Sequence, residues 1–153
     1  MRLKEIIADL ELIALEGDQD PSIGKINFDS REVREGDLFV AIRGTLSDGH
    51  DYMERAIHAG AAAVVCEDPG ASAGAGIPLI SVPDTRRALA QMAANWYGHP
   101  STGLSLVGIT GTNGKTTIAT LLHQMHQLMG FKAGLISTIQ VLVAAESRPA
   151  THT

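Results

Sequence analysis

A glycine-rich loop at residues 111–117, Gly-Thr-Asn-Gly-Lys-Thr-Thr, constrains the fold of this chain more than any other segment. The apolar run at residues 104–110 leads into the loop and predicts a buried strand. Apolar residues at helical spacing continue to Met129, and Gly130 is a typical helix stop. A further strand is predicted at residues 133–138, so the order strand, loop, helix, strand indicates a βαβ unit.

The residue types in the loop suit a triphosphate. Gly111 and Gly114 permit a tight turn that points backbone N–H groups inward, and the N-terminus of the following helix adds partial positive charge. Lys115 supplies a mobile ammonium for the outer phosphates. The Thr116 hydroxyl can help to hold Mg²⁺, and Thr117 adds a second hydroxyl.

An ordinary turn with a solvated lysine is the alternative explanation of this loop. Ile109 stands where the general pattern G-x-x-x-x-G-K-[ST] has a glycine, so only Gly114, Lys115 and Thr116 match it strictly. The strand pattern before the loop and the helix pattern after it favour phosphate binding. We therefore predict a phosphate-binding loop.

Residues 1–98 predict a separate small α/β domain. Gly98 and the residues up to 101 form a plausible linker, so a second domain of the phosphate-loop type is expected to begin near residue 103 and to be incomplete at residue 153. Within the first domain, short apolar segments predict strands and helical spacing predicts helices: strands near residues 26–28, 37–42, 62–66 and 79–82, and helices near residues 3–10, 52–59 and 84–96.

The composition argues against two classes of partner. A net charge of −5 without a run of Lys or Arg argues against nucleic-acid binding. No segment resembles a secretion signal or a membrane span, so we expect no membrane insertion and a soluble, cytoplasmic protein. The one cysteine, Cys66, lies in an apolar run, which predicts a buried strand position.

Several polar residues invite a functional interpretation but also fit ordinary turns and helix faces. Ser30 follows a predicted strand, where a short polar side chain can bind a ligand or its own turn, and on the residues alone the turn is favoured. For His50 a capping or turn role is favoured over catalysis. His123 and His126 have a spacing that can bind metal, but a helix without further ligands on that face is favoured.

The loop sequence at residues 110–117, Thr-Gly-Thr-Asn-Gly-Lys-Thr-Thr, resembles that of the Mur ligase family, which makes the cytoplasmic precursor of bacterial peptidoglycan. The segments Asp-Ser-Arg at residues 29–31, Gly-Asp-Leu-Phe-Val-Ala at 36–41 and Asp-Gly-His-Asp-Tyr at 48–52 resemble the N-terminal domain of one branch. That branch adds the third amino acid to the UDP-linked peptide.

The resemblance implies a UDP-binding N-terminal domain followed by the truncated start of a central ATPase domain. Phe28 and Ser30 would flank the uracil and ribose, and Thr45, Leu46 and Ser47 would line the diphosphate or uridine. Thr153, beside His152, would approach the N-acetylmuramoyl group. ATP would be bound by the phosphate loop, whose members are Gly111, Thr112, Asn113, Gly114, Lys115, Thr116 and Thr117.

The implied chemistry is ATP-dependent peptide-bond formation. ATP phosphorylates the D-glutamyl carboxylate of UDP-N-acetylmuramoyl-L-alanyl-D-glutamate, and a diamino acid, meso-diaminopimelate or L-lysine, attacks the acyl phosphate. Lys115 and Mg²⁺ would stabilise the transferring phosphoryl group. The chain alone is expected to be inactive. Three alternatives stay open: the family member that adds D-alanyl-D-alanine, another phosphate-loop enzyme such as a kinase, and a non-catalytic UDP-sugar-binding module.

Overall fold

The computed structural model describes residues 1–45, 47–70, 74–143 and 146–149. The predicted ligand residues Leu46 and Thr153, and the neighbouring His152, therefore lie outside the described residues. The chain divides into two compact units, Met1–Leu104 and Ser105–Thr153. Each unit is described by itself.

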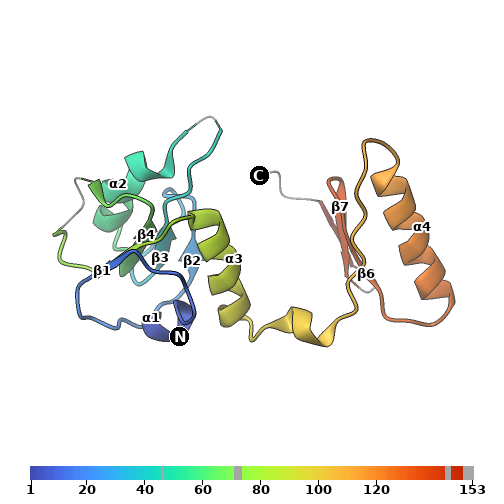
Figure 1. Ribbon diagram of the computed structural model, residues 1–153, viewed down its shortest axis with the longest axis horizontal. Coiled ribbons are helices and arrows are strands. Elements are labelled where there is room, and N and C mark those ends of the chain that lie inside the picture. The colour runs from blue at the N-terminus through green and yellow to red at the C-terminus, as the bar shows by residue number, and fades with distance from the viewer. Residues whose placement is uncertain (46, 71–73, 144–145, 150–153) are drawn as a thin grey trace. The chain divides into compact units, whose positions relative to one another are not determined.

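The first unit is built on a five-stranded sheet with the order β1-β5-β4-β3-β2 (Figure 1). Its four strands from β2 to β5 run parallel, and β1 pairs with β5 in the antiparallel direction. The strands are short: β1 (Ala14–Glu16), β2 (Ile26–Asn27), β3 (Leu38–Val40), β4 (Ala63–Cys66) and β5 (Leu79–Ser81).

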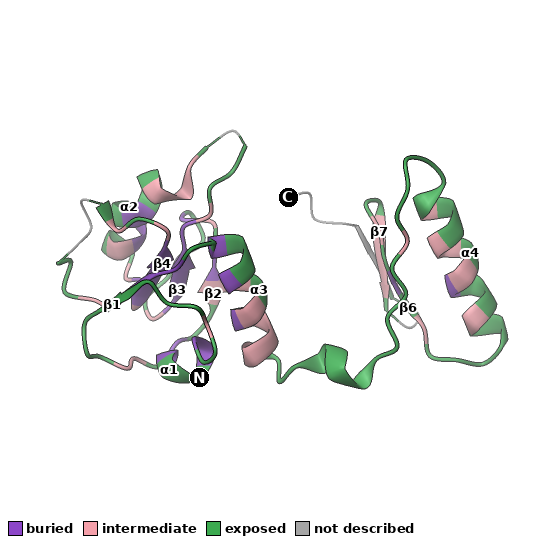
Figure 2. Cartoon of the chain, in the orientation of Figure 1, coloured by how far each residue is buried: buried purple, intermediate pink, exposed green. Residues whose placement is uncertain are grey.

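Helices cover both faces of this sheet, because the central strands are apolar on both sides. Leu38 and Val40 of β3 belong to the core cluster that includes residues of the helices α1 (Leu3–Ile6) and α3 (Thr85–Trp96). Phe39, between them, faces the opposite cluster, which includes residues of α2 (Met53–His58). The 3₁₀ helices η1 (Gly49–Tyr52) and η3 (Pro100–Gly103) complete the unit. Figure 2 shows the central strands as buried.

Most elements predicted for the first unit are confirmed: the strands β3, β4 and β5, the helix α2, and α3, whose N-cap Asp84 accepts hydrogen bonds from the backbone N–H groups of Arg86 and Arg87. The prediction of a buried strand position for Cys66 is also confirmed. Burial raises the pKa of this thiol to about 11.

Two local predictions for the first unit differ from the structure, and one strand was not predicted. The first helix ends at Ile6 instead of continuing to Leu10, and Asp9 has a left-handed φ of 62°, which interrupts a right-handed helix. The strand predicted near residues 26–28 ends at Asn27, which is buried, and Phe28 beyond it is 60% exposed. The edge strand β1 is exposed along its length, so it has no apolar pattern typical of a strand.

The second unit contains the helix α4 (Lys115–Leu128) and an antiparallel sheet of β6 (Gly134–Ile136), β7 (Gln140–Val143) and β8 (Glu146–Pro149). The predicted helix and the strand at β6 are confirmed, and Gly130 follows the helix with a φ of 83°. The predicted strand at residues 104–110 is wrong, since none forms there. A buried strand needs hydrogen-bonding neighbours, and β6 pairs with β7 instead, so the βαβ prediction is also wrong.

None of the helices in the described part of the chain has the length and hydrophobicity that a membrane crossing requires.

Candidate nucleotide-binding sites

The carboxyl ends of the parallel strands bring several loops of the first unit to one edge of the sheet. Ser30 lies in the loop after β2, Thr45 and Ser47 follow β3, and Glu67 follows β4. In open α/β sheets, ligands bind in the crevice outside the carboxyl ends of the strands. Ser30, Thr45 and Ser47, which the sequence predicts as ligands of a UDP group, therefore lie at the edge of the sheet where proteins of this architecture bind ligands.

The loop after β2 is held from within by an ion pair. The Asp29 carboxylate accepts a hydrogen bond from the Arg31 backbone N–H at 3.0 Å, and the Arg31 guanidinium lies 2.7 Å from its Oδ2. Hydrogen bonding from the Arg31 side chain lowers the pKa of Asp29 to about 2. Ser30 between them is only 9% exposed, and within the described residues its hydroxyl makes no hydrogen bond to the protein.

The segment after β3 forms a tight hairpin, here called the edge hairpin, at residues 42–45 and 47–49. Arg43 and Asp48 pair as an antiparallel bridge, and the Gly44 N–H donates to the Ser47 carbonyl at 2.9 Å. At Gly49 a Cβ would lie 2.6 Å from backbone atoms of Ile42, so a side chain there would force the strands of the hairpin apart.

A polar cluster anchors the base of the edge hairpin to the residue after β4 and to the start of α3. The His50 ring lies between Asp48 and the backbone of Glu67: Nδ1 is 2.6 Å from Asp48 Oδ1, and the Glu67 N–H donates to Nε2 at 2.9 Å. The Glu67 carboxylate accepts from both the backbone N–H and the hydroxyl of Thr85, the first residue of α3. Arg43 bridges the two carboxylates, 2.9 Å from Asp48 and 3.5 Å from Glu67.

His50 therefore takes part in more than the predicted turn, because its ring also contacts the backbone of Glu67. Asp48 is the cap of η1, accepting the His50 backbone N–H, and this contact lowers the pKa of Asp48 to about 2, with further help from the His50 ring and Arg43. The spacing Asp-x-His indicates the cap. Sequence reasoning missed the contact of His50 with the backbone of Glu67, because 17 residues separate the two.

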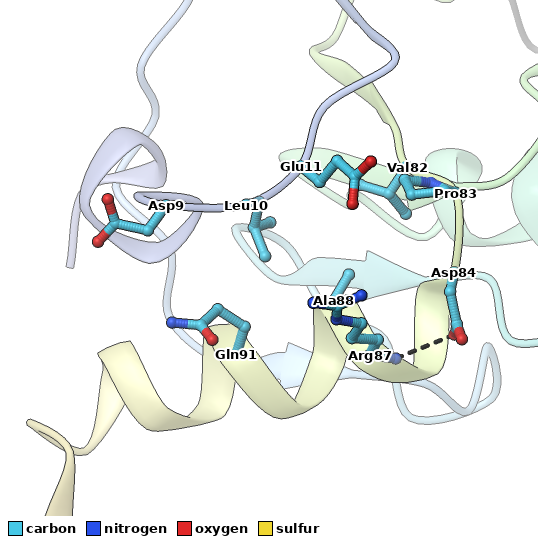
Figure 3. Close-up of a pocket in the computed structure, with 9 residues that line it drawn as sticks. All are labelled: Asp9, Leu10, Glu11, Val82, Pro83, Asp84, Arg87, Ala88 and Gln91. Carbon is cyan, nitrogen blue, oxygen red and sulfur yellow. Dashed lines mark hydrogen bonds between the residues drawn. The ribbon is translucent and has the colours of Figure 1, made fainter.

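Two pockets adjoin this edge of the sheet. One, of about 100 Å³, lies between α3 and the segment that leads to β1 (Figure 3), and it is lined by Asp9, Leu10, Glu11, Val82, Pro83, Asp84, Arg87, Ala88 and Gln91. The other, of about 300 Å³, is lined by Arg43, His50, Asp51, Met53, Glu54, Asp68, Pro69 and Gly70. Neither pocket is lined by Phe28, Ser30, Thr45 or Ser47.

The phosphate loop of the second unit takes its shape from its glycines. Gly114 is the N-cap of α4 with a left-handed φ of 76°, and Gly111 has a φ of 143°. No side chain caps the start of α4, so its first backbone N–H groups stay available to a ligand. The Lys115 ammonium folds back over the loop and donates to the carbonyls of Gly111 and Thr112.

These residues fit a nucleotide with a divalent cation. A phosphate would replace the two carbonyl acceptors of Lys115 with anionic oxygens and so form an ion pair with the ammonium. Thr116 is half-buried, and within the described residues its hydroxyl makes no hydrogen bond, so it is free to be a metal ligand beside phosphate oxygens. The ring of His123 hydrogen-bonds the Ala133 carbonyl, and the ring of His126 hydrogen-bonds the Leu122 carbonyl.

The first unit has a mostly parallel sheet, and the second has a glycine-rich loop before α4, features that are typical of nucleotide-binding proteins of the α/β class. Residues 22–97 match the family model described as "Mur ligase family, catalytic domain", and residues 109–153 match the "Mur ligase middle domain". The chain belongs to the Mur ligase family.

Curated relatives match along the full chain. The UDP-N-acetylmuramoyl-L-alanyl-D-glutamate–2,6-diaminopimelate ligase of Parabacteroides distasonis is 48% identical and that of Bacteroides fragilis 44%, in both cases over 100% of this chain and 32% of the ligase. The chain thus spans about a third of the length of these relatives.

Solved structures of the family share the fold. MurF from Acinetobacter baumannii superposes with a TM-score of 0.60 at 28% identity, over 82% of this chain and 26% of that one. A UDP-N-acetylmuramoyl-L-alanyl-D-glutamate–2,6-diaminopimelate ligase has a TM-score of 0.64 at 23% identity, over 95% and 29% of the two chains, which shows the fold alone.

Proposed function

We propose that this chain supplies the UDP-sugar-binding and ATP-binding loops of a carbon–nitrogen ligase of cytoplasmic peptidoglycan precursor synthesis. The ligase would join a diamino acid to UDP-N-acetylmuramoyl-L-alanyl-D-glutamate at the expense of ATP. The observation that carries the proposal is the identity of 44–48%, along the whole chain, to ligases whose names specify this reaction.

The division of labour follows the two units. Residues 1–98 would bind the UDP-sugar through Phe28, Ser30, Thr45, Leu46 and Ser47, with Thr153 near the N-acetylmuramoyl group. Phe28, Ser30, Thr45 and Ser47 lie at the carboxyl edge of the sheet, which supports this assignment. The Ser30 hydroxyl supports it too, because it has no hydrogen-bond partner within the described residues. Residues 103–153 would begin the ATP-binding domain.

The reaction proceeds in two steps, and the residues of this chain act mainly in the first. A carboxylate oxygen of the D-glutamyl group attacks the γ-phosphorus of ATP, and ADP leaves. The amine of the diamino acid then attacks the acyl carbon, a proton is lost from nitrogen, and phosphate leaves. In the first step Lys115 and the amides of the loop stabilise charge on the transferring phosphoryl group. Mg²⁺, held partly by Thr116, would neutralise phosphate charge when bound.

The names of the relatives favour 2,6-diaminopimelate over L-lysine as the incoming amino acid. The resemblance places the residues that choose between them in a C-terminal domain, so this chain does not decide the choice. A D-alanyl-D-alanine-adding ligase is the weaker candidate. MurF from Acinetobacter baumannii is 28% identical, below the 44–48% of the curated diaminopimelate ligases, whereas the solved diaminopimelate ligase at 23% identity shows the fold alone.

A chimera tests the proposal. In it, this chain replaces the matching third of the Parabacteroides distasonis ligase, and tripeptide formation and phosphate release are measured with ATP, Mg²⁺, the UDP-linked dipeptide and either diamino acid. We expect turnover with 2,6-diaminopimelate in the chimera and none from the 153-residue chain alone. A folded chimera that binds ATP but forms no product would contradict the proposal, and so would turnover by the chain alone.

Ser30→Ala tests the uridine site in the 153-residue chain. We expect it to weaken binding of the UDP-linked dipeptide by about 1–3 kcal/mol, the range for loss of a hydrogen-bond partner in a buried contact. Titration calorimetry measures the change. Ser101→Ala, at an exposed position of η3, is the matched control. Unchanged affinity of the Ser30 variant would mean that this residue only forms a turn.

A further inference from the structure

We infer that His50 is a positioning residue, whose imidazole ties the edge hairpin to the end of β4 and so sets the backbone of Thr45 and Ser47 for the UDP group. The inference rests on the proposed function. His50 itself does not contact the ligand. Its side chain acts only by fixing the position of the edge hairpin.

The hydrogen bonds determine the protonation state of the ring. The Glu67 N–H can only donate, so His50 Nε2 must accept and carries no proton. The proton therefore lies on Nδ1, which donates to the Asp48 carboxylate at 2.6 Å. A neutral imidazole in this tautomer joins the hairpin to β4 through one donor and one acceptor, and its side chain is only 12% exposed.

The Arg43 guanidinium pairs with both carboxylates of the cluster, Asp48 at 2.9 Å and Glu67 at 3.5 Å. The Arg43 side chain is 58% exposed, and ion pairs at such positions contribute little stability. The shielded, directional bonds of His50 are therefore the stiffer link between the hairpin and the sheet.

The position of the hairpin tip depends on its base. Within the described residues, the side chains of Thr45 and Ser47 make no hydrogen bond to the rest of the protein, and both residues are exposed. The bond from Gly44 to Ser47 holds the tip to the bridge of Arg43 and Asp48. A shift of the base thus displaces the tip as a unit.

Three substitutions separate the two bonds of the ring. In His50→Gln the amide oxygen can still accept the Glu67 N–H, whereas in His50→Asn the shorter amide can still donate to Asp48 but cannot reach Glu67. His50→Ala loses both bonds. Calorimetry of the 153-residue chain with UDP-N-acetylmuramoyl-L-alanyl-D-glutamate measures affinity, and amide hydrogen exchange at Gly44 measures how firmly the hairpin is closed.

We expect His50→Ala and His50→Asn to weaken binding at least ~10-fold and to speed exchange at Gly44, because a lost buried hydrogen bond alone accounts for about that factor. His50→Gln should restore most of the affinity. ATP affinity should stay unchanged in all three. His58→Ala is the matched control, since His58 is exposed and bonds only within its own helix.

The outcomes distinguish the inference from the proposed function. A wild-type chain that does not bind the UDP-sugar contradicts the proposed function. Normal binding by a folded His50→Ala variant overturns the positioning role of His50. Rescue by Asn and not by Gln would overturn it too, because the bond to Asp48 does not reach the end of β4. If His50→Ala does not fold, the comparison of Gln with Asn decides.

Discussion

The two units of this chain hold their ligand loops in different ways. In the first unit, helices cover both faces of the sheet, and the loops emerge from strands such as β3 and β4, whose residues are almost fully buried. In the second, Leu135 is the only buried apolar residue among those described, and Leu106 and Leu128 are 74% and 90% exposed. Figure 2 shows α4 as mostly exposed or intermediate.

The difference shows two ways of preorganising a site. The loops after β2 and β3 take their geometry from a packed sheet and from contacts between segments far apart in the sequence, such as that of His50 with Glu67. The phosphate loop takes its geometry from local features: the positive φ angles of Gly111 and Gly114, and a lysine that bonds its own loop. Substitutions should therefore act through packing in the first unit and through backbone conformation in the second.

Gly114→Val should have the largest effect. Its φ of 76° is strained for any residue with a β-carbon and most of all for a β-branched one, so the loop should lose its shape and ATP binding should be abolished. Fluorescent ATP-analogue titration measures this, with Gly103→Ala, at an open position without a left-handed φ, as control. Retained ATP binding would show that the loop does not depend on glycine conformation.

Phe39→Ala and Leu121→Ala compare the packing of the two units directly. Phe39 is 1% exposed in the core, and its truncation should lower the free energy of unfolding by about 3–5 kcal/mol. Leu121 is 59% exposed on α4, and its truncation should change that free energy by no more than ~0.5 kcal/mol.

Urea unfolding measures both effects. The single tryptophan, Trp96, packs against the core of the first unit and reports its unfolding by fluorescence, while circular dichroism follows α4. Similar losses for the two variants would mean that the second unit has a core comparable to the first.

Lys115→Ala should separate binding from chemistry. Loop amides and the helix terminus bind phosphate without the lysine, so ATP affinity should fall modestly. The turnover number of the chimera should fall by at least ~10²-fold, because the ammonium acts most strongly on charge developing in the transition state. Lys132→Ala, at an exposed position, is the control. Near-normal turnover with weakened ATP binding would make Lys115 an anchor only.

Elements with strong local patterns could be predicted from the sequence. Continuous apolar runs gave β4 and β5 correctly, and helical spacing with clear stops gave α3 and α4. The same reasoning failed at residues 104–110, because an apolar run predicts burial only if other strands are there to pair with it. It also missed the exposed edge strand β1, whose pairing with β5 has no local pattern.

For the candidate sites, the glycine turn and the helix start at Lys115 could be predicted because they depend on seven consecutive residues, and phosphate binding there stays a prediction. The cluster of Asp48, His50 and Glu67 could not be predicted, because it depends on the register of β3 beside β4. Phe28 illustrates a further limit. Its exposure depends on where the two-residue strand β2 ends, and no periodicity is visible over so short a length.

The smallest expected effect concerns pH and the anchor of the edge hairpin. The Asp48 carboxylate accepts the His50 backbone N–H, the His50 ring proton and the Arg43 guanidinium, and its pKa is about 2 in place of 3.8. The folded state therefore binds fewer protons than the unfolded state between these values. The stabilisation is present above about pH 4 and is lost as the pH falls towards about 2, so acid should weaken this anchor.

Asp48→Asn removes the charge while keeping the shape of the side chain. Because the Asp48 side chain is 33% exposed, wild type should be more stable than the variant by no more than ~1 kcal/mol at about pH 7, and the difference should shrink by about pH 3. Urea unfolding followed by Trp96 fluorescence measures it in the first unit, to which Asp48 belongs. A difference that does not change with pH would mean that the shape of the Asp48 contacts matters and its charge does not. The edge hairpin would then resemble the phosphate loop, held by backbone geometry more than by charged side chains, and the contrast between the units would be narrower than the packing suggests.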